Sequence, residues 1–314
     1  MTHSAIYVVG SSNTDMVVKA DKLPSPGETV IGGDFLMNPG GKGANQAVAA
    51  ARLGGQVYFV GKTGNDLFGK QAIQQFKREN IRIEHVATDP KLPSGVALIN
   101  VDAHGENSIS VAPGANAALT VADVQHALNQ LKKGDTVLIQ LEIPVEVVHH
   151  VVRESEALGA RVILNPAPAQ PMPETTLGRL FLITPNETEA GLLTGIKVHD
   201  SASAAKAAHQ LRSTGCRNVV ITMGPKGAYV KSDDHECIIP AIPVSAVDTT
   251  AAGDCFNGAL AVALSEGQDL LSAARFAAKA AAISVTRMGA QSSLPTRKEL
   301  EAITLSTSSD FPVA

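Results

Sequence analysis

The sequence predicts an α/β protein whose mainly parallel central sheet is flanked by helices, and two observations support that prediction. Short β-branched apolar runs alternate with Ala-rich helical stretches along most of the chain. Uninterrupted apolar runs are typical of strands buried on both faces, which requires helices on both sides of the sheet. In addition, polar and acidic residues follow several of these runs directly, at the position where open α/β sheets bind ligands.

The elements are expected in the following order. A strand at 5–10 is followed by a helix at 43–54, a strand at 56–61 and a helix at 66–80. Further strand-like runs, each beside a plausible helix, lie at 136–141, 161–165, 181–185 and 218–224. The last third is almost entirely helical, from 253 to about 286. Because 44% of the 314 residues are hydrophobic, the chain can form one large or two modest domains. We expect a single α/β domain over 1–314.

Two segments, approximately 16–37 and 94–111, interrupt this alternation. Both consist of strand-like pieces with turn sequences, "SPGET" in the first and "DAHGENS" in the second, and neither is bounded by a linker-like composition. We expect them to form a small antiparallel β-sheet inserted within the domain. Such a sheet would act as a lid over a cleft, although ordinary surface hairpins fit the pattern nearly as well.

Charge and aromatic content argue against two classes of partner. The chain has 26 Lys and Arg against 30 Asp and Glu, a formal net charge of -4, so no basic excess indicates nucleic acid or an acidic membrane. Aromatic residues make up only 4% and Trp is absent, which argues against stacking platforms for single-stranded nucleic acid. No apolar run approaches the ~20 residues of a membrane span.

The N-terminus and the cysteines indicate a cytoplasmic protein. The stretch "MTHSAIYVVGSSN" lacks a basic region followed by an apolar core of signal-peptide length. Cys216, Cys237 and Cys255 are far apart and match no zinc or CxxC spacing. Free thiols in a reducing cytoplasm are the simplest interpretation.

A glycine-rich stretch, "GGKG" at 40–43, leads straight into the helix at 43–54. It is not a Walker A loop, because Gly43 follows Lys42 where that motif has Ser or Thr, and it is not GxGxxG, because Gln46 takes the last position. Its backbone amides can still bind a polar ligand, and Lys42 and Asn45 are spaced to face the same ligand. A plain Gly-rich helix entry explains the same residues.

Polar side chains also follow two strands. Asn13 and Asp15 come after the first strand and, two apart in extended chain, can present an amide and a carboxylate to a polyhydroxylated ligand. Glu142 follows the strand at 136–141 in the same way. A simple turn explains Asp15 equally well.

Two further motifs have alternative interpretations. In "TPNETEA", Asn186 and Glu189 lie on one face of a helix start and suit water-mediated Mg²⁺. An N-capped helix with acids in its first turn explains them as well, and we prefer that explanation for Glu187. In "ITMGPKGAYV", a nucleotide can lie against Thr222, Gly224 and Gly227, but a hairpin turn needs the same glycines.

The stretch "VDTTAAGDCFNGAL" (247–260) combines small residues with a carboxylate, Asp254, at the start of a helical pattern. The unpaired N–H groups of a helix start attract anions. Asp is also a common N-cap, which stabilises a helix by about 0.5–2 kcal/mol. The motif therefore indicates either a capped helix or an anion site beside a fixed negative charge.

Together, "GGKGANQAVAAARLG", "LNPAPA", "TPNETEA", "VDTTAAGDCFNGAL" and "VTRMGAQSSLP" resemble the signatures of the ribokinase family, the PfkB-type carbohydrate kinases. The motifs span nearly the whole chain. The resemblance implies a ribokinase-like fold with a β-sheet lid that also forms a homodimer contact. It implies ATP-dependent phosphorylation of D-ribose at the 5-hydroxyl, with 2-deoxyribose or another sugar as the alternative substrate.

The resemblance also implies roles for individual residues. Asp254 would be the general base, and the amides of Ala251, Ala252 and Gly253 an anion hole for the γ-phosphoryl group. Sugar-contacting positions would be Asn13, Asp15, Gly41, Lys42, Asn45, Glu142 and Asp254. Positions near ATP would be Asn186, Thr222, Gly224, Lys226, Gly227 and Gly253. Asn186 and Glu189 would bind Mg²⁺ through water, and a K⁺ site would use Asp248, Thr250, Ser284, Arg287, Gly289 and Ser293.

The chain departs from the family pattern at three positions. Ala251 replaces a glycine, which is tolerable if its φ is negative. Ala278 stands near the adenine where relatives often have His or Asn, so a side-chain contact to the base is in doubt there. Cys255 follows the base at a helix start, which can lower a thiol pKa. We hypothesise that it is alkylated with loss of activity, and a buried, inert thiol is the alternative.

Two other classes of protein fit less well. A non-catalytic sugar- or nucleotide-binding regulator needs no general base, yet Asp254 is intact. A dinucleotide-dependent oxidoreductase has an α/β fold too, but GxGxxG does not follow the first strand. Fold alone would not separate these classes.

Overall fold

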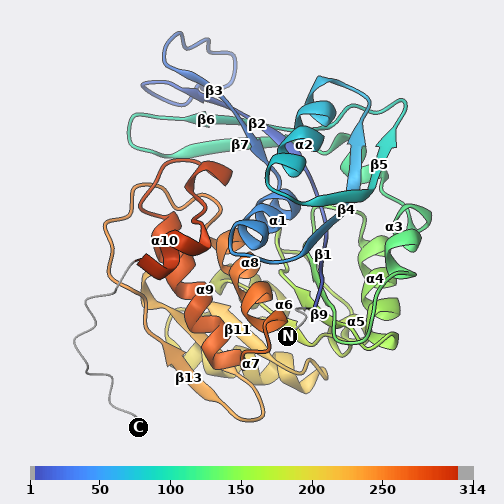
Figure 1. Ribbon diagram of the computed structural model, residues 1–314. Helices are drawn as coiled ribbons and strands as arrows, with labels where there is room; N and C mark the ends of the chain where they lie inside the picture. Colours follow the sequence, from blue (N-terminus) through green and yellow to red (C-terminus); the bar gives the residue numbers. More distant parts are fainter. Residues whose placement is uncertain (1–3, 303–314) are drawn as a thin grey trace.

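The protein is described by a computed structural model that covers residues 4–302, in which a large sheet is covered by helices on both faces and a small sheet projects from one end (Figure 1). The large sheet has the order β13-β12-β11-β10-β9-β8-β1-β4-β5. Neighbouring strands from β11 to β5 are parallel, and β12 and β13 are added antiparallel. The predicted α/β class with a mainly parallel sheet is thus confirmed. Its strands are β1 (Ile6–Val9), β4 (Val57–Gly64), β5 (Arg82–Asp89), β8 (Thr136–Ile139), β9 (Arg161–Leu164), β10 (Leu182–Ile183), β11 (Val219–Thr222), β12 (Ala228–Lys231) and β13 (Glu236–Ile239).

Two apolar cores cover the two faces of this sheet. Strand β1 shows the division, because Ile6 and Val8 point into one core whereas Tyr7 and Val9 point into the other. The first core packs against α1 (Lys42–Arg52), α2 (Leu67–Arg78), α8 (Ala252–Ser265), α9 (Leu270–Ser284) and α10 (Arg297–Ala302). The second packs against α3 (Val121–Leu128), α4 (Val145–Ala157), α5 (Glu174–Leu177), α6 (Glu187–Thr194) and α7 (Ser201–Ser213). The short 3₁₀ segments are η1 (Gly114–Ala118), η2 (Gly224–Lys226) and η3 (Gln291–Ser293).

Helices α1 and α8 pack unusually closely, and this contact positions the site. Gly258 on α8 faces α1, where an added Cβ would lie 2.6 Å from Ala49 Cβ and 2.7 Å from the carbonyl oxygen of Gln46. The Ala-rich composition of both helices permits the same close approach along their length. Consequently the first turn of α1 lies against the first turn of α8.

The small sheet, which we call the lid, contains β2 (Asn13–Lys19), β3 (Phe35–Gly40), β6 (Gly95–Val101) and β7 (Asn107–Ala112) in the order β3-β2-β6-β7. The expectation of a purely antiparallel sheet is corrected at its centre, where β2 and β6 are parallel. Each is the first strand of an antiparallel pair, and both strands leave the large sheet in the same direction. Strand β2 begins at Asn13, before the expected start near 16, so Asn13 and Asp15 belong to β2.

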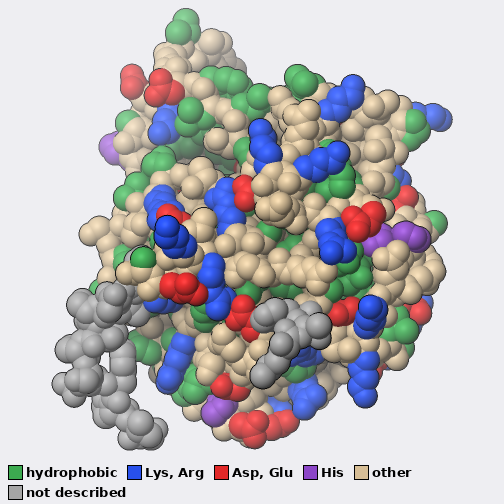
Figure 2. Space-filling model, in the orientation of Figure 1, with side chains coloured by type: hydrophobic (Ala, Val, Ile, Leu, Met, Phe, Trp, Pro, Cys, Tyr) green, Lys and Arg blue, Asp and Glu red, His purple; other side chains and the backbone are tan. Residues whose placement is uncertain are grey.

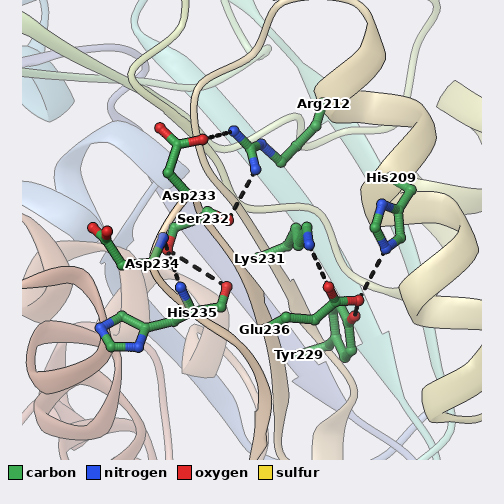
Figure 3. Close-up of polar contacts among 9 residues, drawn as sticks. All are labelled: His209, Arg212, Tyr229, Lys231, Ser232, Asp233, Asp234, His235 and Glu236. Carbon is green, nitrogen blue, oxygen red and sulfur yellow. Dashed lines mark hydrogen bonds and ion pairs between the residues drawn. The ribbon is translucent and has the colours of Figure 1, made fainter.

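The antiparallel edge of the large sheet is fastened by a polar cluster on the β12–β13 hairpin (Figure 3). Glu236 accepts hydrogen bonds from Lys231, from Tyr229 Oη at 2.6 Å and from His209 Nε2 at 2.9 Å. These donors, Lys231 first, lower the pKa of Glu236 to about 2. Arg212 on α7 binds Asp233 and the carbonyl oxygen of Ser232 in the same hairpin. The cluster ties α7 to the turn and leaves the edge strand charged, which is a common protection of exposed edges.

No helix within residues 4–302 is long and apolar enough to cross a membrane.

Candidate active site

The centre of the site is Asp254, in the first turn of α8. Its side chain is buried, and both carboxylate oxygens accept hydrogen bonds from α1. Asn45 Nδ2 donates to Oδ2 at 2.9 Å, and Gln46 Nε2 donates to Oδ1 at 2.9 Å. Burial raises the pKa of Asp254, while Lys42 and the two amide donors oppose that rise. The result is a desolvated carboxylate that is held in a fixed orientation, as a general base requires.

The start of α1 depends on glycine. Gly41 has φ 89°, a left-handed conformation that glycine adopts without strain. A Cβ on Gly43 would lie 2.6 Å from Ser11 N and 2.7 Å from the carbonyl carbon of Gly10. The glycines thus allow the helix start to pack on the chain that leaves β1, where Ala44 N donates to the carbonyl oxygen of Ser11 at 2.9 Å.

Glu142, just beyond β8, stabilises this helix start. Its Oε2 accepts from Lys42 N at 3.0 Å and from Ser11 Oγ at 2.5 Å. The residue before α1 is Gly41, which has no side chain that could cap the helix. The carboxylate of Glu142 supplies the missing acceptor instead. Ser11 is a site residue that the sequence analysis missed, because its partner is 131 positions away.

Four carboxylates act on Lys42, namely Asp254, Glu142, Glu189 and Asp15. Burial, then the charges of Glu142 and Asp254, raise the pKa of Asp15 to about 6. Burial alone would lower the pKa of Lys42, but the carboxylates, Asp254 first, raise it above its usual value. A group of desolvated acceptors around one cation suits a neutral ligand rich in hydroxyl donors.

Asn13 lies at the start of β2 and is also buried. Its Oδ1 accepts from Asn116 Nδ2 at 2.8 Å, and Asn116 in η1 also binds the backbone of Ser12 in both directions. The hydrogen bond from Asn116 therefore fixes the orientation of the Asn13 side chain. Asn116 is a second site residue that the sequence analysis missed.

A cavity of about 330 Å³ borders this group, and it is lined by Asn13 but by none of Asp15, Lys42, Glu142 and Asp254. It separates α2 from the lid and is lined in part by Thr14 and Met37. The strand register places Thr14 on the opposite face of β2 from Asp15. The convergent carboxylates, and not this cavity, therefore define the candidate site.

The N-terminus of α8 offers backbone donors directly before Asp254. No side chain caps this helix. Ala252 N donates to the carbonyl oxygen of Thr249 at 3.2 Å, whereas the N–H groups of Ala251 and Gly253 make no hydrogen bond within residues 4–302. Gly253 is exposed and Asp254 is buried behind it, so an anion can approach these donors from solvent.

One departure from the family pattern has a structural consequence. The sequence analysis accepted Ala251 on the condition of a negative φ, but its φ is 59°. Ala251 is the N-cap residue of α8, and the turn into the helix requires the left-handed conformation. The alanine therefore carries backbone strain that a glycine would not.

The segments expected to bind a monovalent cation lie together. Asp248 Oδ1 accepts from Thr250 N at 2.9 Å, and its Oδ2 accepts from Gly289 N at 2.8 Å. Although burial acts in the opposite direction, these bonds keep the pKa of Asp248 low. The hydroxyls of Ser284 and Ser293 donate to nearby carbonyls, which leaves the lone pairs of the hydroxyl oxygens and the backbone carbonyls to offer a cation. Arg287 pairs with Glu299 at 2.7 Å, which fixes the second segment.

Asn186 and Glu189 form a capping box at the start of α6. Glu189 N donates to Asn186 Oδ1 at 2.8 Å, and Asn186 N donates to Glu189 Oε2 at 2.8 Å. This confirms the N-cap geometry at the start of α6. No group of three or more His, Cys, Asp or Glu side chains within residues 4–302 could hold a metal ion directly.

The turn between β11 and β12 lies next to this helix start, because Asn186 and Thr222 form a parallel bridge. Lys226 pairs with Glu187 at 2.9 Å. Gly227 has φ 94°, and a Cβ there would lie 2.0 Å from the carbonyl oxygen of Ile239, so the hairpin requires this glycine. Gly224 is exposed with open space around it.

The hypothesis of a reactive Cys255 is corrected by its surroundings. The side chain is completely buried in the core between α8 and α9. Burial raises its pKa to about 12 despite its place near a helix start. Such a thiol is protonated and inaccessible, which supports the inert alternative.

Comparisons with known proteins agree with this arrangement. Residues 4–297 match the pfkB family carbohydrate kinases. A ribokinase of Haemophilus influenzae is 45% identical over 294 residues, which are 94% of this chain and 96% of that protein. A deoxyribokinase of Salmonella typhi is 39% identical over 291 residues, 92% of this chain and 95% of that protein. The structure of Arabidopsis thaliana ribokinase in complex with ribose and ATP has a TM-score of 0.87 and 32% identity, covering 96% of this chain and 98% of that chain.

The chain therefore belongs to the pfkB family of carbohydrate kinases, and it is an ATP-dependent sugar kinase with a ribokinase-like fold. The family resemblance seen in the sequence motifs is confirmed. Within the family, two of the three relatives above are ribokinases and the third is a deoxyribokinase.

Proposed function

We propose that this kinase transfers the γ-phosphoryl group of ATP to the 5-hydroxyl of D-ribose, giving D-ribose 5-phosphate and ADP. The observation that supports this most directly is the position of Asp254. It is a buried carboxylate held by two amide donors, directly behind the free N–H groups of an uncapped helix. A proton acceptor is thereby placed next to an anion site, which is the pairing that phosphoryl transfer to a hydroxyl needs.

The reaction follows from this pairing. The 5-hydroxyl oxygen attacks the γ-phosphorus, the bond from that phosphorus to the bridging oxygen breaks, and ADP leaves. The hydroxyl proton passes to Asp254. As the carboxylate becomes neutral, its repulsion of the phosphoryl group disappears. The N–H groups of Ala251 and Gly253 stabilise the charge on the transferring phosphoryl group. The N–H group of Ala252 contributes as well when its hydrogen bond to the carbonyl oxygen of Thr249 breaks.

The proposed sugar site combines the lid with the start of α1. Acceptors at Asp15 and Glu142 suit sugar hydroxyl donors, while Lys42 and the amides of Asn13 and Asn45 supply donors in return. The backbone at Gly41 allows close approach. Because Glu142 also fixes the first turn of α1, sugar binding and the orientation of Asn45 are linked.

The proposed nucleotide site lies between the starts of α6 and α8 and the turn after β11, with contacts from Asn186, Thr222, Gly224, Lys226, Gly227 and Gly253. Asn186 and Glu189 would hold Mg²⁺ through water. Burial raises the pKa of Glu189, and a cation bound nearby would lower it again and favour the ionised carboxylate. Asp248, Thr250, Ser284, Arg287, Gly289 and Ser293 would hold K⁺ by oxygen atoms. These ions supply charge neutralisation at the phosphates and rigidity at the anion site, respectively.

2-Deoxyribose is the alternative substrate, because a deoxyribokinase is among the relatives. The two sugars differ by one hydroxyl, and a site built to bond that hydroxyl rejects its absence strongly. ADP release should be measured with ATP, Mg²⁺ and K⁺ over a range of each sugar. A higher kcat/KM for ribose is the expected result. A preference for 2-deoxyribose would overturn the assignment of ribose as the substrate. Inactivity with both sugars would exclude ribose and 2-deoxyribose alike.

We also propose a homodimer formed through the lid. Figure 2 shows hydrophobic side chains on the surface of the lid. On the lid face opposite Asp15, the strand register gathers four exposed apolar side chains: Val18, Phe35, Met37 and Leu98. Phe35 is 61% exposed and Leu98 is 53% exposed, and apolar patches of this kind mark contact surfaces. Phe35→Glu should convert the protein to monomers in size-exclusion chromatography with light scattering, whereas Lys22→Glu outside the patch should not. A wild-type monomer would exclude the proposal.

A reducing, cytoplasmic location fits the cysteines. All three are free within the described structure, and Cys216 and Cys255 are buried in the cores. Fractionation of cells should place the protein with the cytoplasmic marker enzymes. Recovery in a secreted or membrane fraction would contradict this location.

A further inference from the structure

Gln46 is the second donor to Asp254, and the sequence analysis assigned it no role. Its side chain is fully buried on α1, next to the proposed sugar contact Asn45. Gln46 Nε2 lies 2.9 Å from Asp254 Oδ1. We propose that Gln46 is a positioning residue that fixes the carboxylate of Asp254 so that Oδ2 is the atom that accepts the proton. This inference rests on the proposed role of Asp254 as the general base.

The orientation of the Gln46 amide is fully determined. Its Nε2 also donates to Asn165 Oδ1 at 2.9 Å, and its Oε1 accepts from Gln140 Nε2 at 2.6 Å. Both N–H groups and the carbonyl oxygen therefore have partners. A flipped amide would place its oxygen against the carboxylate and its donors against Gln140 Nε2, and both contacts are repulsive.

This network divides the two oxygens of Asp254 between two environments. Oδ1 faces Gln46, from which the chain of amides continues to Asn165 and to the carbonyl oxygen of Thr184. Oδ2 faces Asn45, whose own Oδ1 is buried without a hydrogen-bond partner in the described structure. Asn45 thus has an acceptor left for a sugar hydroxyl, which places the sugar on the Oδ2 side.

Gln46 is also a neutral donor in a strongly charged neighbourhood. The ionisable groups whose charges act on Asp254, or which Asp254 acts on, are Lys42 of α1, Asp15 of β2, Glu142 beyond β8, Glu189 of α6 and Cys255 of α8. A second lysine at position 46 would pair with the base and hold it, and a carboxylate would repel it. An amide orients the base and favours its ionised form without adding a charge.

The test is the pH profile of Gln46→Met, which is close in length to glutamine but cannot donate. Loss of a hydrogen bond to the charged form should raise the pKa of Asp254, so the acidic limb of kcat/KM should move up by about one pH unit. We expect kcat at neutral pH to fall several-fold, with little change in the KM for ATP. The matched control is Gln140→Met, equally buried in the same network but without a contact to Asp254. Its acidic limb should stay at the wild-type position.

The two pH profiles show whether Gln46 positions the carboxylate of Asp254. Equal shifts in both variants, or no shift in Gln46→Met, would overturn the positioning role. If Gln46→Met does not fold, Gln46→Glu provides the same test, because a carboxyl there can donate only when protonated. That variant should gain an alkaline limb that wild type lacks, and its absence would also overturn the inference. Full activity of Asp254→Asn would instead refute the proposed function itself.

Discussion

Asn45 of α1 and Asp254 of α8 are 209 positions apart in the chain, yet Asn45 Nδ2 lies 2.9 Å from Asp254 Oδ2. The contact exists because the two helix starts are pressed together, with Gly258 admitting the backbone of α1. It joins a residue proposed to contact the sugar to the residue proposed to take its proton. Any change that separates α1 from α8 should therefore affect both binding and turnover.

Asp15→Asn should stabilise the protein at neutral pH. The pKa of Asp15 is raised from 3.8 to about 6 in the folded chain, so its ionisation costs stability. That cost is complete above pH 6 and vanishes below the unfolded pKa. We expect a Tm increase of about 2–5 °C at pH 7.5, which disappears near pH 4. Calorimetry at the two pH values checks this, and an equal change at both would show that charge is not the cause.

The same substitution should weaken sugar binding. An amide at position 15 offers one acceptor oxygen in place of two charged ones. The KM for the sugar should rise, and kcat should change less, because Asp15 is not the proton acceptor. In wild type, the KM for the sugar should likewise rise as the pH falls through about 6. A KM that stays constant across this range would remove Asp15 from the sugar site.

Ala251→Gly should raise the Tm. The left-handed φ of 59° at Ala251 is strained for any residue with a Cβ. Glycine removes the strain but is more flexible in the unfolded chain, so we expect a net increase of about 1–3 °C. Ala252→Gly is the matched control, since Ala252 lies within the helix and should lose stability or be neutral. Equal effects at both positions would contradict the strain argument.

The thiols should differ in reactivity. Cys216 and Cys255 are buried, and burial raises the pKa of each to about 12. Cys237 on β13 is only partly buried. A thiol reagent should therefore label at most Cys237 in the native protein, and Cys237→Ser should abolish this labelling. Rapid native labelling that survives Cys237→Ser and is blocked by ATP would restore the hypothesis of a reactive Cys255.

Activity should depend on a monovalent cation. Replacing K⁺ by tetramethylammonium should lower kcat, because the segments joined by Asp248 would lose the ion proposed to rigidify them. Asp248→Asn should raise the K⁺ concentration needed for half-maximal activity, since it weakens the bonds to Thr250 N and Gly289 N. Steady-state kinetics over a range of K⁺ measure both effects. A rate that is independent of the cation would exclude the site.

Much of this fold was predictable because its signals are local. The buried strand Ile6–Val9 is a continuous apolar run, and helix α1 begins within a glycine-rich stretch that allows the turn from β3 into the helix. The direction of β2 against β6 was not predictable, because strand pairing in the lid depends on where two distant segments leave the large sheet. Similarly, the φ of Ala251 is set by the turn into α8 and not by its own residue type.

The residues of the candidate site also fall into those that the sequence predicted and those that it did not. Asp254 and Lys42 stand in recognisable motifs, so the sequence could name them. The supporting residues Gln46, Ser11 and Asn116 could not be found, since each acts through a partner that is brought near only by the tertiary fold. Polar residues of this kind carry no spacing signal, and their burial becomes visible only in three dimensions.

The most direct test of the whole account is Asp254→Asn. The variant keeps the size of the side chain but cannot accept the hydroxyl proton, so turnover with ribose and ATP should fall by about 10²–10⁴-fold or more. Ribose and ATP affinities, measured by calorimetry, should remain near wild type. Turnover close to wild type in the folded variant would contradict the assignment of the general base, and with it the proposed mechanism.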